Sequence, residues 1–296
     1  MSLTASDRSA YFCALTAIAL WSTVATGFKL GLRHLEPAQL VMLGTLISTV
    51  IFWAVTLYSG TVRLSARHLC MAAVMGLINP TLYYLVLFEA YDRLPAQIAQ
   101  PLNYTWSITL ALLAIPVLKQ HLSARSMLGI AISYAGVVIL LTQGNFDQPL
   151  AFEHTGIFLA LASTVLWAIY WLANARLNIP ATALMAWSFT FAAPLTVGLC
   201  LFGPGLPPLS IEAGVYGLWV GAVEMGISFL LWQRALRLTS SAARLGQLIF
   251  LSPFASLLLI GLVLGESIHP ASFVGLVVIA LGILVSHRGQ PQASSD

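Results

Sequence analysis

Long apolar runs dominate the sequence, and they limit the fold more than any motif does. Short stretches with charged residues, proline or glycine separate these runs. An α-helix of about 20 apolar residues crosses the hydrocarbon core of a bilayer. Ten transmembrane helices are therefore predicted, near residues 11–31, 37–58, 67–90, 95–118, 125–143, 155–176, 181–202, 212–235, 240–264 and 269–287.

The composition supports a membrane protein and excludes nucleic-acid binding. Hydrophobic residues make up 59% of the 296 residues and charged residues 8%, whereas a soluble domain has about 25% charged residues. The net charge of +3 comes from scattered basic residues, without the basic stripe that phosphates require. We expect an all-α integral membrane protein, with the lipid bilayer as a partner and no nucleic acid.

The sequence lacks motifs for catalysis, ATP hydrolysis and metal binding. Cys13, Cys70 and Cys200 lie far apart inside apolar runs, so neither a disulfide framework nor a metal cluster is expected. No Gly-rich loop with a following Lys-Ser or Lys-Thr is present for nucleotide phosphates. We therefore expect no enzyme activity, no metal and no cofactor.

The positions of lysine and arginine predict the orientation in the membrane, because basic residues concentrate on the cytoplasmic side. If the N-terminus is cytoplasmic, only Lys29, Arg33 and Arg93 of the 13 basic residues lie on the opposite side. The cytoplasmic residues are then Arg8, Arg63, Arg67, Lys119, Arg125, Arg176, Arg234, Arg237, Arg244 and Arg288. This asymmetry predicts a multi-pass protein with both termini in the cytoplasm.

The two halves of the sequence match at a constant offset of 146 residues. "ALTAIALWST" (14–23) aligns with "ALASTVLWAI" (160–169), and "LNYTWSITLALLAIPVLKQ" (102–120) aligns with "LIFLSPFASLLLIGLVLGE" (248–266). Each half contains five predicted helices, an odd number, so the second half enters the membrane in the opposite sense. Inverted repeats of this kind place the substrate at their interface near the membrane midplane.

The repeat defines the predicted domain organisation. The expected parts are a cytoplasmic tail (1–10), a first five-helix repeat (11–143), a connecting loop (144–154), a second, inverted five-helix repeat (155–287) and a second cytoplasmic tail (288–296). The two repeats are expected to surround a central cavity.

Several of these segments resemble a known family. The Leu-Trp pairs at 20–21 and 166–167 and the segment "LSPFASLLLIGLVLGE" (251–266) are similar to the EamA family of the drug/metabolite transporter superfamily. The stretch "NYTW" (103–106) resembles its subgroup of YddG-type aromatic amino acid exporters. The resemblance implies ten helices around a cavity, secondary transport, and export of metabolites across a bacterial inner membrane.

Polar and aromatic residues near the middle of the predicted helices indicate a substrate site. Such groups are expensive to expose to lipid, so they are expected to face the interior. Helical spacing groups Trp167 with Trp171, and Asn79 with Tyr83. The expected substrate-binding residues are Trp21, Asn79, Tyr83, Asn103, Tyr104, Trp106, Trp167, Trp171, Glu224, Gln247 and Phe250.

Glu224 lies near the middle of an apolar run. Its spacing from Gly217, Gly221 and Ser228 predicts one helix face of small residues, and with one gap between the halves it aligns with Asn79. We expect Glu224 to line the cavity, where it could pair with a substrate ammonium group or carry a proton. The alternative is that the glycines serve helix packing and Glu224 bonds to a neighbouring helix.

Two prolines are the predicted hinges. Pro101 and Pro253 lie in corresponding predicted helices of the two halves. A proline inside a helix removes one backbone hydrogen bond and favours a kink.

The sequence favours a secondary transporter that exports small amphipathic metabolites, foremost aromatic amino acids, by alternating access. Aromatic side chains suit a flat apolar group through stacking and a cation through attraction to the ring face. The nearest alternative is a multidrug or purine exporter of the same superfamily. A channel and a ligand-sensing receptor are alternatives from other classes, but the sequence has neither a continuous polar stripe nor a signalling domain. The sequence decides neither whether transport is coupled to protons nor whether the protein is a monomer or a dimer.

Overall fold

The apolar runs form helices throughout the part of the chain that the structure describes. This computed structural model describes residues 5–60, 62–118, 123–147, 150–177, 179–239, 245 and 248–287. The first half contains α1 (Ala5–Ser22), α2 (Val24–Gly31), α3 (Pro37–Ser59), α4 (Ala66–Gly76), the π-helical segment η1 (Leu77–Leu82), α5 (Tyr83–Arg93), α6 (Ala96–Tyr104), α7 (Trp106–Leu118) and α8 (Ala124–Thr142). The second half contains α9 (His154–Arg176), α10 (Ala181–Leu201), α11 (Ile211–Leu218), the π-helical segment η2 (Trp219–Ile227), α12 (Ser228–Leu238), the 3-10 turn η3 (Leu248–Phe250), α14 (Leu251–Leu259), the π-helical segment η4 (Ile260–Leu264) and α15 (Pro270–His287). These described residues contain no strand, so the all-α prediction is confirmed.

Most of the helices can cross a membrane by length and composition. Within the described residues, seven helical stretches are long and apolar enough: Ser6–Gly31, Pro37–Ser59, Ala66–Arg93, Ala124–Thr142, His154–Asn174, Ala181–Leu201 and Ile211–Leu238. Leu248–Leu264 and Pro270–Ser286 are shorter apolar helices. The remaining predicted segment, 95–118, forms α6 and α7, which meet at Thr105. The chain is a multi-span helical membrane protein, and ten complete crossings stay a prediction.

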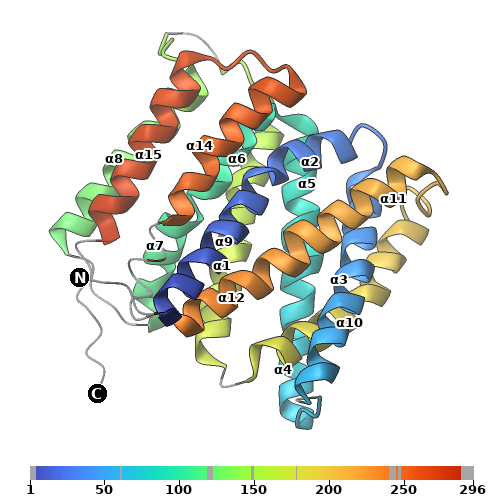
Figure 1. Cartoon of the computed structure of the whole chain (residues 1–296). Coiled ribbons are helices and arrows are strands. Elements are labelled where there is room, and N and C mark those ends of the chain that lie inside the picture. The colour runs from blue at the N-terminus through green and yellow to red at the C-terminus, as the bar shows by residue number, and fades with distance from the viewer. Residues whose placement is uncertain are drawn as a thin grey trace.

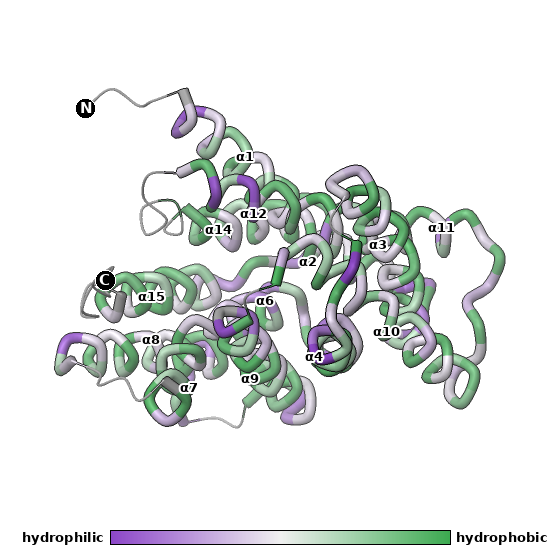
Figure 2. Tube along the Cα trace, turned by 90° about the horizontal axis from the view of Figure 1, so that it is seen from below, coloured by the Kyte–Doolittle hydropathy of each residue, from purple (hydrophilic) through white to green (hydrophobic). Residues whose placement is uncertain are grey.

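Large apolar side chains cover the outer surface of the helices. Leu262 is 82% exposed, Leu258 70% and Phe158 69%. Figure 2 shows hydrophobic residues along most of the helical trace. An apolar surface of this extent is unfavourable in water and suits contact with lipid chains.

The last helix of each half packs closely against its counterpart, and Figure 1 shows α8 and α15 side by side. A Cβ atom on Gly136 would lie 2.7 Å from the Ile279 nitrogen, and one on Gly275 would lie 2.9 Å from the Gly136 oxygen. Near the other end of the pair, Gly129 faces the backbone of Gly282. The two helices therefore run antiparallel, as an inverted repeat requires. Their close approach depends on small residues, as in many membrane helix pairs.

Both halves have a junction between helical elements at the same place in the repeat. In the first half α6 ends before Thr105, whose backbone N–H bonds to the Leu102 oxygen at 3.1 Å. In the second half η3 ends and α14 begins at Leu251, which the offset of 146 aligns with Thr105. Pro101 lies inside α6, and Pro253 is the third residue of α14. Both predicted hinges thus lie next to helix breaks, and their movement stays a prediction.

A second pair of breaks lies at the π-helical segments. With an offset of 145, η1 aligns with the C-terminal part of η2. The kink at Asn79 in η1 and the wide turns of η2 both free backbone carbonyls, which must be satisfied inside a membrane. The Gly76 carbonyl accepts a hydrogen bond from Thr81 Oγ1 at 2.9 Å, and its counterpart on Gly221 accepts one from Ser48 Oγ at 2.7 Å. The repeat therefore preserves the bend and uses hydroxyl groups from different elements to stabilise it.

Candidate functional site

Glu224 is buried between the two halves of the protein. Its side chain is 8% exposed, and Oε1 accepts a hydrogen bond from the Tyr84 hydroxyl at 3.0 Å. Oε2 has no hydrogen-bond partner among the described residues. Tyr84 belongs to α5 in the first half and Glu224 to η2 in the second, so this bond connects the repeats.

The glycines that precede Glu224 pack against α3. A Cβ atom on Gly217 would lie 2.8 Å from Leu43 Cβ, and one on Gly221 would lie 2.6 Å from Ile47 Cβ. The packing alternative therefore describes these glycines. The wide turn of η2 changes the register after them, and the Glu224 carboxylate reaches Tyr84 of α5.

Trp167 is the centre of a buried aromatic cluster. Its ring stacks on Tyr83 with centroids 4.5 Å apart and on Tyr170 at 5.6 Å. Trp171 meets it edge-on at 5.8 Å, and so does Phe229 at the same distance. The cluster joins α9 to α5 and α12. We call these five residues the Trp167 cluster.

The Trp167 cluster is continuous with the Glu224 carboxylate. Tyr83 packs edge-on against Tyr84, with ring centroids 4.8 Å apart, and the Tyr84 hydroxyl donates a hydrogen bond to Glu224. On the other side, Phe229 contacts Trp21 at 5.7 Å. One connected surface of rings thus leads from α1 to a buried acid.

Two amides complete the polar part of the site. Asn103 Nδ2 donates to Ser163 Oγ at 2.9 Å, and Asn103 Oδ1 accepts from the Tyr83 hydroxyl at 3.5 Å. Asn79 is 2% exposed, and its Oδ1 has no hydrogen-bond partner among the described residues. Asn79 has an extended backbone (φ −140°, ψ 119°), as the residue before a proline prefers.

The other predicted binding residues, where they are described, are half-buried. Tyr104 is half-buried at the C-terminal end of α6. Trp106 and Phe250 are half-buried and pack against the main hydrophobic core. Gln247 lies outside the described residues.

Several residues of the site are absent from the predicted set. Tyr170 shares the predicted face of Trp167 and Trp171, so its spacing could have included it. Tyr84 lies beside Tyr83, and only the packing of α5 on η2 distinguishes the partner of Glu224. Phe229 is one apolar residue among many, and no sequence signal indicates its contact with Trp167.

A separate polar cluster ties the halves together at one end of the bundle. Glu266 accepts hydrogen bonds from the backbone nitrogens of Ala96 at 2.9 Å and Gln97 at 3.2 Å, at the beginning of α6. Gln97 Oε1 accepts from the His269 nitrogen at 3.1 Å and from Ser272 Oγ at 3.0 Å. These bonds connect α6 with the start of α15.

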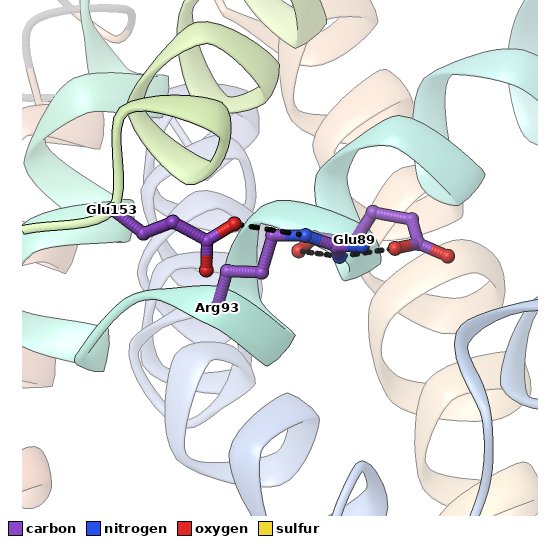
Figure 3. Close-up of polar contacts among 3 residues, drawn as sticks. All are labelled: Glu89, Arg93 and Glu153. Carbon is purple, nitrogen blue, oxygen red and sulfur yellow. Dashed lines mark hydrogen bonds and ion pairs between the residues drawn. The ribbon is translucent and has the colours of Figure 1, made fainter.

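Arg93 makes a further connection, between α5 and the start of α9. Its guanidinium pairs with Glu89 one turn earlier, and its Nε lies 3.5 Å from Glu153 Oε1 (Figure 3). Half-exposed ion pairs of this kind contribute little to stability. Arg93 is therefore a structural contact.

The chain matches the EamA-like transporter family over residues 8–142 and again over 154–288. It is 28% identical over 284 residues to the aromatic amino acid exporter YddG of Ancylobacter novellus, a match that covers 95% of this chain and 96% of that protein. It is 23% identical to the "Probable terminal-alkyne amino-acid exporter" of Streptantibioticus cattleyicolor, over 94% of this chain and 93% of that protein. A solved crystal structure with 23% identity and a TM-score of 0.68 has the same fold, over 94% of this chain and 98% of that chain. The chain thus belongs to the EamA-like transporter family.

Proposed function

We propose that the protein exports aromatic amino acids and related small amphipathic metabolites across a bacterial inner membrane, by alternating access and without ATP. The observation that carries this proposal is the buried Tyr83–Trp167 stack beside the Glu224 carboxylate. One relative is named an aromatic amino acid exporter and another a probable terminal-alkyne amino-acid exporter, and these names support the substrate class.

In this proposal the aromatic side chain of the substrate packs on the Trp167 cluster. Offset or edge-on ring pairs contribute about 0.5–1.5 kcal/mol each beyond their buried area. Glu224 receives the ammonium group or a proton. We assign substrate binding to Trp21, Asn79, Tyr83, Asn103, Tyr104, Trp106, Trp167, Trp171, Glu224, Gln247 and Phe250.

The helix breaks support the proposed movement. The α6–α7 junction at Thr105 and its counterpart at Leu251 would allow half-helices to tilt on either side of the site. Pro101 and Pro253 act as the hinges. With both termini cytoplasmic, such tilting would expose the site to the two sides of the membrane in turn.

Flux into liposomes tests this function. Purified protein is reconstituted, and uptake of labelled phenylalanine and tryptophan is measured with and without an imposed proton gradient, against empty vesicles. We expect protein-dependent flux of both amino acids. If neither moves faster than in empty vesicles while a purine or a hydrophobic cation moves readily, the substrate assignment is wrong.

A further inference from the structure

The site beside the Trp167 cluster contains unpaired hydrogen-bond acceptors. Glu224 Oε2 and Asn79 Oδ1 are buried and have no hydrogen-bond partner among the described residues. Buried polar atoms without partners are unfavourable and uncommon. Both atoms are acceptors. A ligand that satisfies them must present hydrogen-bond donors, as an ammonium group does with its N–H groups.

Among the described residues, the unpaired donor of the Trp167 cluster that a substrate carboxylate could meet is neutral. Trp171 Nε1, on a ring that packs against Trp167, is a buried donor that no described residue accepts from. An indole N–H can orient a carboxylate, but a charged donor binds it much more strongly. The site should therefore bind the ammonium group of an amino acid more strongly than its carboxylate.

Two described basic residues of the neighbouring helices, Lys29 and Arg176, donate hydrogen bonds to backbone carbonyls. Lys29 Nζ donates to the carbonyl oxygens of Tyr91 at 2.7 Å and Leu94 at 3.0 Å. Arg176 donates to the Val117 carbonyl. Glu224 forms no ion pair with any residue that the structure describes. The buried carboxylate is thus available to a cation supplied by the substrate.

We propose that Glu224 selects substrates by their ammonium group and that the substrate carboxylate is dispensable. The transported class then extends from aromatic amino acids to arylalkylamines, which have the ring and the ammonium group but no carboxylate. The ring packs against Tyr83 and Trp167, and the ammonium group donates to Glu224 Oε2 and Asn79 Oδ1. The inference rests on the proposed function, because it assigns chemistry within the same site.

Three phenyl compounds separate the contributions of the two charged groups. Phenethylamine has only the ammonium group, 3-phenylpropionate has only the carboxylate, and phenylalanine has both. Their binding to the purified full-length protein in detergent is measured by isothermal titration calorimetry. We expect phenethylamine to bind within about threefold of phenylalanine and 3-phenylpropionate to bind at least about tenfold more weakly.

Two kinds of result in this series would contradict either the ammonium inference alone or the proposed function as well. If 3-phenylpropionate binds as tightly as phenylalanine, or if phenethylamine binds about tenfold more weakly than phenylalanine, the ammonium inference is wrong while amino-acid transport stands. If none of the three compounds binds and a different class of metabolite is transported, the proposed function fails and the inference fails with it.

Two matched substitutions assign the effect to Glu224. We expect Glu224→Gln to weaken phenethylamine binding at least about tenfold and to leave 3-phenylpropionate binding unchanged or stronger. Glu212→Gln is the control, because Glu212 is an exposed acid in the same predicted crossing. Equal effects of the two substitutions would overturn the proposal. If Glu224→Gln does not fold, the three-compound series on the unsubstituted protein still decides it.

Discussion

The two π-helical segments differ in chemistry although they occupy matching places in the repeat. In the first half the bend contains Asn79 with an extended backbone, followed by Pro80. In the second half the helix continues through the bend as a wide turn without proline, and it carries Glu224. Proline enforces a break through the missing N–H and its ring. The repeat thus preserves the place of the bend but not its backbone conformation, and the acid is specific to the second half.

The two halves therefore contribute different chemical groups to the site. The first half supplies the neutral groups of the site, Asn79, Tyr83 and Tyr84, and the second half supplies the ionisable group and Trp167. An inverted repeat therefore need not give a symmetrical site. Substitutions at matching positions can test this division directly.

The largest effect is expected at the matching glycines of the two bends, Gly76 and Gly221. A Cβ atom on Gly76 would overlap with the Ser188 backbone oxygen, whereas one on Gly221 would lie 2.6 Å from Ile47 Cβ and 2.9 Å from the Gly44 oxygen. We expect Gly76→Ala to destabilise the fold by about 3 kcal/mol and Gly221→Ala by about half as much, because the added methyl group would overlap more deeply with the Ser188 carbonyl than with its neighbours at Gly221. Thermal unfolding of both variants in the same detergent measures this. Equal melting temperatures would contradict the assigned difference.

The next effect concerns the aromatic half of the site. We expect Trp167→Ala to weaken phenylalanine binding by about 2 kcal/mol, or about 30-fold, because buried tryptophans are common binding hot spots. Trp53→Ala is the control, since Trp53 packs on Trp187 with centroids 5.1 Å apart, outside the Trp167 cluster. Calorimetric titration of both variants gives the comparison. A similar loss in both would indicate general destabilisation.

A smaller effect is expected when the acid is moved from one bend to the other. We expect Glu224→Gln to flatten the dependence of flux on pH and the double variant Asn79→Asp, Glu224→Asn to behave in the same way. The reason is that the Tyr84 hydroxyl, which orients the carboxylate at 3.0 Å, donates to position 224. Liposome flux measured across a series of pH values tests this. Recovery of the original pH profile by the double variant would show that either bend can hold the functional acid.

The smallest effect is expected from the hydroxyl groups that cap the freed carbonyls. Thr81→Val removes the bond to the Gly76 oxygen, and Ser48→Ala removes the bond to the Gly221 oxygen. Each should lower stability by about 1 kcal/mol, the usual net value of one hydrogen bond. The melting temperatures of the two variants should therefore fall together. A fall in only one of them would mean that the bends are stabilised differently.

The sequence predicts the helices and part of the site for identifiable reasons. Apolar length specifies the crossings, and a spacing of four residues places Trp167 and Trp171 on one face of α9, where the structure has them in contact. The partner of Glu224 was not predictable, because it depends on how η2 packs against α5. The wide turns were not predictable either, since their backbone hydrogen bonds leave no periodic signal in the sequence. Only the proline of the first bend indicates a distortion.

The glycine contact between α8 and α15 limits which parts of the protein can move relative to each other. Gly136 faces the backbone of Ile279, and Gly275 faces the backbone of α8. The hydroxyl groups of Ser126 and Ser133 also donate hydrogen bonds to backbone oxygens of α15. These two helices should move as one rigid body during any conformational cycle. The change between inward-open and outward-open forms then requires the remaining helices to tilt relative to this rigid pair.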